Sequence, residues 1–268
     1  MKKKRTWHLK YVFGAAGFVF LFLLWWLISY LMRLGGNFLL PYPLPTLERM
    51  ADDLFGGGAY LTYPAIGWTL LRIVIGFVAS FLLGGLFGTI AGLHRRFGDF
   101  MGPFVVFSRA VPTAAVVIIL VAIFTGYRGM NTFTPCFLVF LVAFPLIYEA
   151  FRKGIASEAK ETRDALRIEC GDKSIKAVFA VLLPDAWNYI ALGLAQSLGL
   201  SVKVSIMSEI LVNSSEARGG LGGLIQNAYI YGFDMTAVVA YSLIAVLLSL
   251  MMDIPLSILR RSVKKKIG

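Results

Sequence analysis

The stretch ALRIECGDKSIKAVFAVLLP, residues 165–184, lies in the longest charged interval of an otherwise apolar sequence. In its second half, apolar residues recur at the i, i+3, i+4 and i+7 spacing that places side chains on one helical face: Ile175, Val178, Phe179 and Leu182. Gly171 can adopt the left-handed conformation that ends one helix, Asp172 can cap the next, and Pro184 is expected to stop it. The stretch therefore predicts a helix, a turn and a short amphipathic helix.

The surroundings of this stretch leave two interpretations of its apolar face. Apolar segments long enough to cross a bilayer lie on both sides of it. A short amphipathic helix between two spans needs a surface that buries its apolar side chains. It can lie on the lipid headgroups, or it can dock on a cytoplasmic partner.

The composition is that of an integral membrane protein. The chain has 268 residues, of which 58% are hydrophobic and only 15% charged, and its mean hydropathy is +0.75; a soluble domain has roughly 25% charged residues. The net charge of +11 does not indicate nucleic acid, because the basic residues lie between hydrophobic runs rather than along a soluble face. The cysteines and histidines have neither the number nor the spacing of a metal site or a disulfide framework: Cys136, Cys170, His8 and His94.

Hydrophobic runs predict six transmembrane helices in one domain covering residues 1–268. The expected spans are 11–32, 65–93, 100–124, 132–148, 189–212 and 235–259, with a cytoplasmic loop at 150–188. No cleavage site follows the first run, so we expect it to stay as a span. After this run, three prolines at alternate positions precede Thr46, which is expected to cap a helix that reaches about Leu54. Gly84 and Gly88 form a G-x-x-x-G pair that permits close helix packing.

The distribution of Lys and Arg orients these spans. The N-terminus, the loop between spans two and three, the interval 150–186 and the C-terminus together hold nineteen of them, and the opposite side holds four. The remaining three, Arg72, Arg109 and Lys203, fall within apolar segments. The positive-inside rule therefore predicts that both termini and the stretch 165–184 are cytoplasmic.

The sequence contains no pattern of catalytic residues. Gly171-Asp172-Lys173-Ser174 looks like the end of a phosphate-binding loop, but the glycines that such a loop requires are absent and Asp172 would repel phosphate. No Ser/His/Asp arrangement or pair of intramembrane carboxylates is present. An enzyme is therefore not expected, and energy for uphill movement would come from another protein.

The quoted stretch resembles the cytoplasmic loop motif of permease subunits of ATP-binding-cassette importers, which reads E-A-A, three residues, G, nine residues, I-x-L-P. Counted from Ala165, Gly171 falls at position 7, Val181 at 17, Leu183 at 19 and Pro184 at 20. The head departs from the motif, because Ala165-Leu166-Arg167 lacks the acidic residue with which the motif begins.

Further matches, from about residue 38 to the C-terminus, resemble the nitrate, sulfonate, taurine and pyrimidine-precursor branch of this family. They are Leu40-Pro41-x-Pro43, Thr69-Leu70-Leu71-Arg72-Ile73 with Gly76, Arg109-Ala110-Val111-Pro112, and Ser208-Glu209-Ile210 followed by Gly220-Leu221-Gly222-Gly223-Leu224-Ile225. After the third-span arginine, the P-x-P of the family is reduced to Ala110-x-Pro112.

The resemblance implies an all-α type I importer permease in a bacterial inner membrane. Its partners would be a cytoplasmic ATPase that binds the ATP and Mg, an extracytoplasmic binding protein, a second permease copy, which we expect to be identical, and membrane lipid; no cofactor is expected on this chain. The short helix in the quoted stretch would be a coupling helix that transmits closure of the ATPase dimer to the spans. The residues expected to form this coupling site are Ala165, Leu166, Gly171, Asp172, Ile175, Val178, Phe179, Leu183 and Pro184.

Charged residues inside apolar spans are candidates for the solute pathway. An ionised side chain costs at least about 2.5–3.5 kcal/mol at mid-bilayer unless it is paired or hydrated. For Arg72 and Glu209 the alternative is a structural ion pair. Arg109 and Lys203 are better placed to line a cavity for an anionic solute, although a structural role is the alternative for them as well. The further candidates on the fifth span are Gln196, Ser201 and Ser205.

A secondary transporter or channel that needs no ATPase is the alternative class. Such proteins usually show inverted repeats or broken spans with acidic residues at mid-membrane. This sequence has no clear repeat, and Glu209 is its one marginal intramembrane acid. Neither the solute nor the identity of the second permease copy follows from the sequence, because the resemblance places specificity largely in the binding protein.

Overall fold

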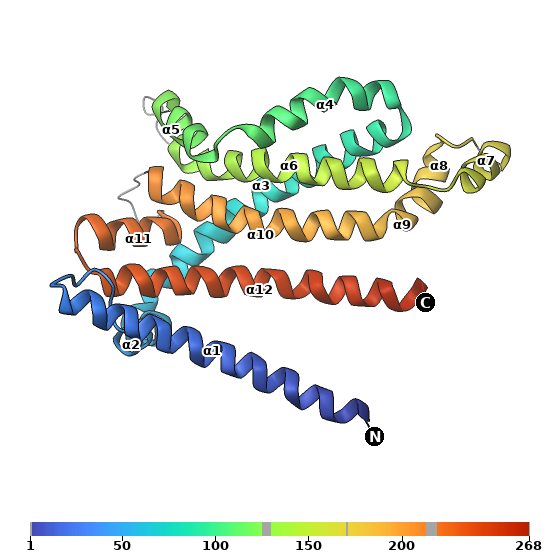
Figure 1. Ribbon diagram of the computed structural model, residues 1–268. Helices are drawn as coiled ribbons and strands as arrows, with labels where there is room; N and C mark the ends of the chain where they lie inside the picture. Colours follow the sequence, from blue (N-terminus) through green and yellow to red (C-terminus); the bar gives the residue numbers. More distant parts are fainter. Residues whose placement is uncertain (1, 125–129, 170, 213–218, 268) are drawn as a thin grey trace. The chain divides into compact units, whose positions relative to one another are not determined.

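The computed structural model describes residues 2–124, 130–169, 171–212 and 219–267, and these residues form helices joined by short turns (Figure 1). The helices are α1 (Lys2–Leu34), α2 (Pro43–Phe55), α3 (Ala59–Leu93), α4 (Arg95–Ala110), α5 (Thr113–Phe124), α6 (Met130–Ala156), α7 (Lys160–Glu169), α8 (Ile175–Ala177), the π-helix η1 (Val178–Leu182), α9 (Leu183–Asp185), α10 (Trp187–Val212), α11 (Gly220–Ile230) and α12 (Met235–Ile267). The all-α prediction is confirmed.

Five of the described helices are long and apolar enough to cross a membrane, and the pair α4 and α5 makes a sixth if it counts as one span. The predicted span over 100–124 contains two helices, which meet at an angle of 90°. Val111 is extended there, with ψ 128°, as the ring of Pro112 requires of the residue before it. The fourth span continues to Ala156, eight residues beyond the predicted end.

The chain divides into two compact units, one formed by residues 1–63 with 224–244 and the other by residues 64–223 with 245–268. A single domain over the whole chain stays a prediction. The second unit contains the stretch that resembles a coupling motif.

In the second unit, α3 packs on α6 along a stripe of small residues at four-residue spacing. The stripe is longer than the predicted G-x-x-x-G pair and consists of Gly76, Ser80, Gly84, Gly88 and Gly92. A Cβ atom at Gly88 would lie 2.5 Å from the carbonyl oxygen of Tyr148, and the Ser80 hydroxyl donates to the carbonyl of Phe140 at 3.1 Å. The small residues therefore let the two backbones approach closely.

Helices α6 and α10 run side by side in the same unit (Figure 1). Gly193 of α10 lies against Ala150 of α6, since an added Cβ would come within 2.3 Å of the Ala150 Cβ. A further cluster of buried side chains joins these two helices to α5 through Val117, Leu138 and Val204. The pair forms a packed support for the loop that connects them.

In the first unit, the proline-rich segment after α1 is bound to that helix. The indole nitrogen of Trp25 and the hydroxyl of Ser29 both donate to the carbonyl of Pro41, at 3.1 and 3.0 Å. Thr46 is not the helix cap that the sequence predicts. The helix α2 begins at Pro43, where a proline is tolerated because the first turn needs no N–H partner, and the Thr46 hydroxyl donates to the Tyr42 carbonyl at 2.8 Å.

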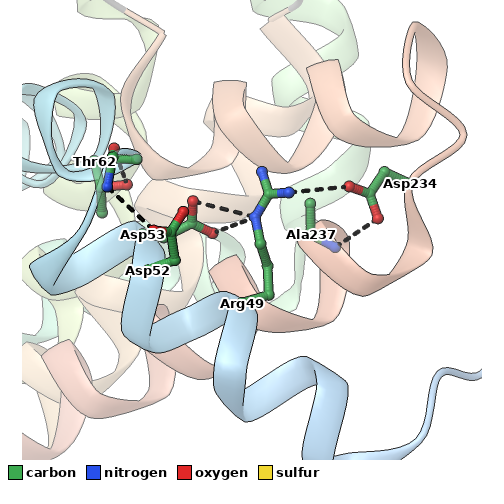
Figure 2. A network of polar contacts seen from close by, with 8 residues as sticks. Arg49, Asp52, Asp53, Thr62, Asp234 and Ala237 are labelled. Atoms are coloured by element: carbon green, nitrogen blue, oxygen red, sulfur yellow. Dashed lines mark hydrogen bonds and ion pairs between the residues drawn. The ribbon is translucent and has the colours of Figure 1, made fainter.

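A polar network joins α2 to the start of α12 within this first unit (Figure 2). The Arg49 Nε donates to both carboxylate oxygens of Asp53, at 3.3 and 3.2 Å, and its Nη1 lies 3.6 Å from Asp234. Asp234 accepts from the backbone N–H of Ala237 at 3.0 Å and so caps α12. Asp53 is fully buried, which makes its pairing with Arg49 a requirement for stability.

Candidate functional site

The loop between α6 and α10 contains α7, α8, η1 and α9, which lie together at one end of the two long helices (Figure 1). Gly171 has a φ of +82°, so the predicted left-handed turn after α7 is confirmed. Cys170, which the sequence treats as an incidental loop residue, lies outside the described residues. The turn reverses the chain from α7 into the short helix that begins at Ile175.

The cap of this short helix is Ser174 rather than Asp172. The Ser174 Oγ accepts from the backbone N–H of Ala177 at 3.1 Å. The Asp172 carboxylate instead accepts from Arg167 Nε at 3.0 Å, and Arg167 also lies 3.5 Å from Asp164. The residue that departs from the family motif, Arg167, therefore holds the end of α7 to the turn.

A further expectation about the short helix is wrong. Pro184 does not end it, because the chain stays helical from Ile175 through η1 and α9 to Asp185. The Leu183 N–H bonds five residues back, to Val178. This wider π turn precedes the proline, which lacks an N–H and crowds the previous turn of an α-helix.

The predicted single apolar face is divided into two adjoining stripes. Val178 and Leu182 are buried, whereas Ile175 is 79% and Phe179 69% exposed. Each pair is spaced i, i+4, so each forms its own stripe along the helix.

The inner stripe packs into the core that α6 and α10 share. Leu166 of α7 is buried in the same cluster, and Leu183 packs against it. The other buried members are Ala143, Ile147, Phe151, Ile155, Ala177, Ala186, Ile190 and Leu194. The loop is thereby fixed to the ends of the two long helices and presents a second apolar stripe outward.

Opposite charges on α3 and α10 form a buried network in the second unit. Glu209 accepts from Arg72 Nη1 at 2.8 Å, from the Thr69 hydroxyl at 2.9 Å and from the Gly222 N–H at 3.1 Å. The Thr69 hydroxyl in turn accepts from the Leu221 N–H at 2.9 Å. The structural ion pair weighed for Arg72 and Glu209 is present, and it also binds the first turn of α11.

The glycines at this turn fit closely around the carboxylate. Gly220 has a φ of +72°, and a Cβ added to it would lie 2.5 Å from the Glu209 carboxyl group. A Cβ on Gly222 would come equally close to the Glu209 Cβ and to the carbonyl of Ile206. The glycines, which lack a Cβ, therefore allow backbone N–H groups of this segment to approach Glu209.

The remaining pathway candidates do not lie on one surface. Ser201 and Ser205 are buried, and the Ser201 hydroxyl donates to the carbonyl of Ser197 at 2.7 Å. Gln196 and Lys203 are exposed on another face of α10, and Arg109 is exposed in the last turn of α4. The described residues therefore place Gln196 and Lys203 together, apart from the two serines.

Comparison with known families decides the identity of the chain. The model of the binding-protein-dependent transport system inner membrane component family matches residues 82–265, which include the coupling-type loop and α10. The chain belongs to this family. It is a permease subunit of an ATP-binding-cassette importer.

Relatives of this permease carry the same kind of name. A "Probable ABC transporter permease protein" of Brucella melitensis biotype 1 is 28% identical over 84% of the chain and 86% of its own length. The bicarbonate transport system permease protein CmpB of Synechococcus elongatus is 30% identical over 60% of the chain and 55% of its own length. The nitrate import permease protein NrtB of the same organism is 25% identical over 79% and 74%.

Several contacting residues of the permease escaped the sequence analysis. Thr69 and Gly222 bind Glu209 from 140 and 13 residues away, and pairing at such distances has no local signal. Ser174 did have a local sequence signal, because a serine three residues before Ala177 is an ordinary cap pattern. Ile168 also had a local sequence signal, since it is an apolar residue among charged neighbours. It is 88% exposed on α7.

Proposed function

We propose that this permease forms half of a translocation pathway for a small anionic or heteroaromatic solute, with a second, identical copy forming the other half. A binding protein delivers the solute outside, and a cytoplasmic ATPase that binds ATP and Mg drives the cycle. The spans cross a bacterial inner membrane, and the termini and residues 150–188 lie on its cytoplasmic side. Nitrate and bicarbonate permeases among the relatives support an anionic solute for this chain.

The outward stripe of the coupling loop is the observation that carries this proposal. Ile175 and Phe179 project from a helix whose other apolar stripe is packed into the core. An exposed apolar stripe on a firmly held loop is suited to insertion into a cleft of the ATPase. Movement of that cleft then reaches α6 and α10 through the buried side chains of Leu166, Val178 and Leu182.

Lys203 supports the assignment of a pathway face. It is exposed on the α10 span, where facing lipid would cost about 2.5–3.5 kcal/mol. Contact with water, solute or the second copy removes this cost. We therefore assign the α10 face that carries Gln196 and Lys203 to the pathway, and Arg109 is a further cation for an anion.

Uptake into vesicles tests the proposed function. Vesicles that contain the permease, its ATPase and its binding protein should accumulate nitrate, bicarbonate or another small anion. This accumulation should require ATP on the side of the membrane where the ATPase is bound. Equal accumulation without ATP or without the ATPase would favour a secondary transporter or channel and overturn the proposal.

In the same vesicles, Lys203→Ala is expected to lower uptake at least about tenfold, which corresponds to about 1.4 kcal/mol of lost solute interaction. Lys203→Arg retains the charge and serves as the control, with uptake close to that of the unchanged protein. Assembly is followed by co-purification of the ATPase. Unchanged uptake by the alanine variant would remove Lys203 from the pathway.

A further inference from the structure

A groove of about 490 Å³ lies between α3 and the coupling loop, within the second unit. The side chains that line it from α3 are Phe81, Leu82, Gly85, Leu86, Thr89 and Leu93. Its floor includes Phe151 of α6, and its far wall comes from α8, η1 and α9. The lining is almost entirely apolar, and Lys173 is the one charged residue among the described residues that form it.

The apolar walls are open to the surroundings. Leu82 and Leu86 are 61% and 55% exposed on a helix that is long enough to span a membrane. An exposed apolar groove on a transmembrane helix is stable when hydrocarbon fills it. The groove therefore has a lipid-facing wall and a wall made by the coupling loop.

The length of the groove matches one leaflet. Its lining on α3 runs from Phe81 to Leu93, which is about 18 Å at 1.5 Å per residue. One leaflet contributes about 15 Å to the hydrocarbon core of a bilayer. A lipid acyl chain lying along this part of α3 would thus have about the length of one leaflet.

Positive charge borders the groove. Lys173 lines it, and Arg95 and Arg96 are exposed just after Leu93, where α3 ends. The nearby acid Asp172 is already paired with Arg167. Cationic side chains beside an apolar groove are complementary to a phosphate-bearing headgroup with its acyl chain.

We propose that this groove binds an anionic phospholipid, with an acyl chain along α3 and the headgroup phosphate at Lys173. The inference rests on the proposed cytoplasmic position of the loop, which places the headgroup end at the inner surface. Ile175 and Phe179, which form the outward stripe of the coupling loop, also line the groove, so the bound lipid contacts the loop along the side that faces α3.

Lipid retention by the purified permease tests this site without the ATPase. After extraction in mild detergent and lipid removal, phosphatidylglycerol or phosphatidylcholine is added back and bound lipid is counted by native mass spectrometry. We expect a clear preference for phosphatidylglycerol. Lys173→Glu should weaken its binding by about fivefold or more, and Lys176→Glu, on the same loop but outside the groove lining, should weaken it less.

A second pair of variants tests the apolar wall. Leu86→Trp fills the groove and should displace phosphatidylglycerol, whereas Leu83→Trp, on an exposed part of α3 outside the lining, should not. Equal retention by both tryptophan variants, or equal binding of the two lipids, would overturn the proposal. A photoreactive group at position 86 that labels the ATPase instead of lipid would also overturn it, since the groove would then belong to the protein interface.

These outcomes are separable from failure of the proposed function. Leu86→Trp leaves both residues of the outward stripe, Ile175 and Phe179, unchanged, so the ATPase should still co-purify with this variant. Loss of lipid with retained ATPase supports the lipid site alone. Loss of ATPase from the unchanged permease contradicts the proposed coupling but leaves the lipid measurement intact.

Discussion

Gly171→Arg is expected to abolish uptake and ATPase stimulation while the permease still inserts into the membrane. Gly171 has a φ of +82°, and a non-glycine residue in this left-handed region costs about 1–2 kcal/mol. No neighbour lies within 4 Å of an added Cβ, so the expected damage comes from the backbone turn and from the bulky cation next to the docking stripe. The measurement compares ATP hydrolysis and uptake in vesicles carrying each variant.

Gly171→Asn is the matched control, because asparagine tolerates the left-handed conformation better than other non-glycine residues. It should retain most of the stimulation. Normal uptake by the arginine variant, at an equal amount of inserted protein, would contradict the role of this turn in coupling.

Glu209→Ala is expected to destabilise the permease by about 3–5 kcal/mol, because it leaves the buried charge of Arg72 without its carboxylate. The Gly222 N–H and the Thr69 hydroxyl lose their acceptor in the same step. Thermal unfolding in detergent should show a lower midpoint. The effect should extend to α11, whose first turn the carboxylate binds.

The double variant Arg72→Met/Glu209→Met is expected to recover much of this stability, since replacing a whole buried ion pair by apolar side chains is often neutral. The exposed pair of Arg167 and Asp164 provides a reference, because breaking it should cost no more than about 1 kcal/mol. Equal stability of the unchanged permease and of Glu209→Ala would contradict the account of the network.

Local chemistry accounts for the parts of the coupling loop that the sequence predicted. A glycine between two helical patterns predicts a left-handed turn, and Gly171 has it. Asp172 is not the cap because its carboxylate accepts from Arg167, five residues away, and the Ser174 hydroxyl caps the short helix in its place. The division of the apolar face follows from packing, since Val178 and Leu182 are buried in the cluster shared with α6 and α10 whereas Ile175 and Phe179 stay exposed.

The membrane part shows the same limit. Apolar runs predict the spans but not the 90° bend at Pro112. The local signal for that bend is the preference for an extended residue before a proline. Helical spacing separates Gln196 and Lys203 from Ser201 and Ser205, and that separation was available from the sequence. The partners of Glu209 could not be predicted from the sequence, because pairing between α3 and α10 depends on tertiary packing.

The most direct test of the central claim is photo-crosslinking from the coupling loop in cells that make the complete transporter. A photoreactive residue at Ile175, which is exposed, should label the ATPase. The same residue at Val178, which is buried in the core, should label it little. Labelling of the ATPase from neither position, or equally from both, would contradict the proposal that this loop couples the permease to ATP hydrolysis.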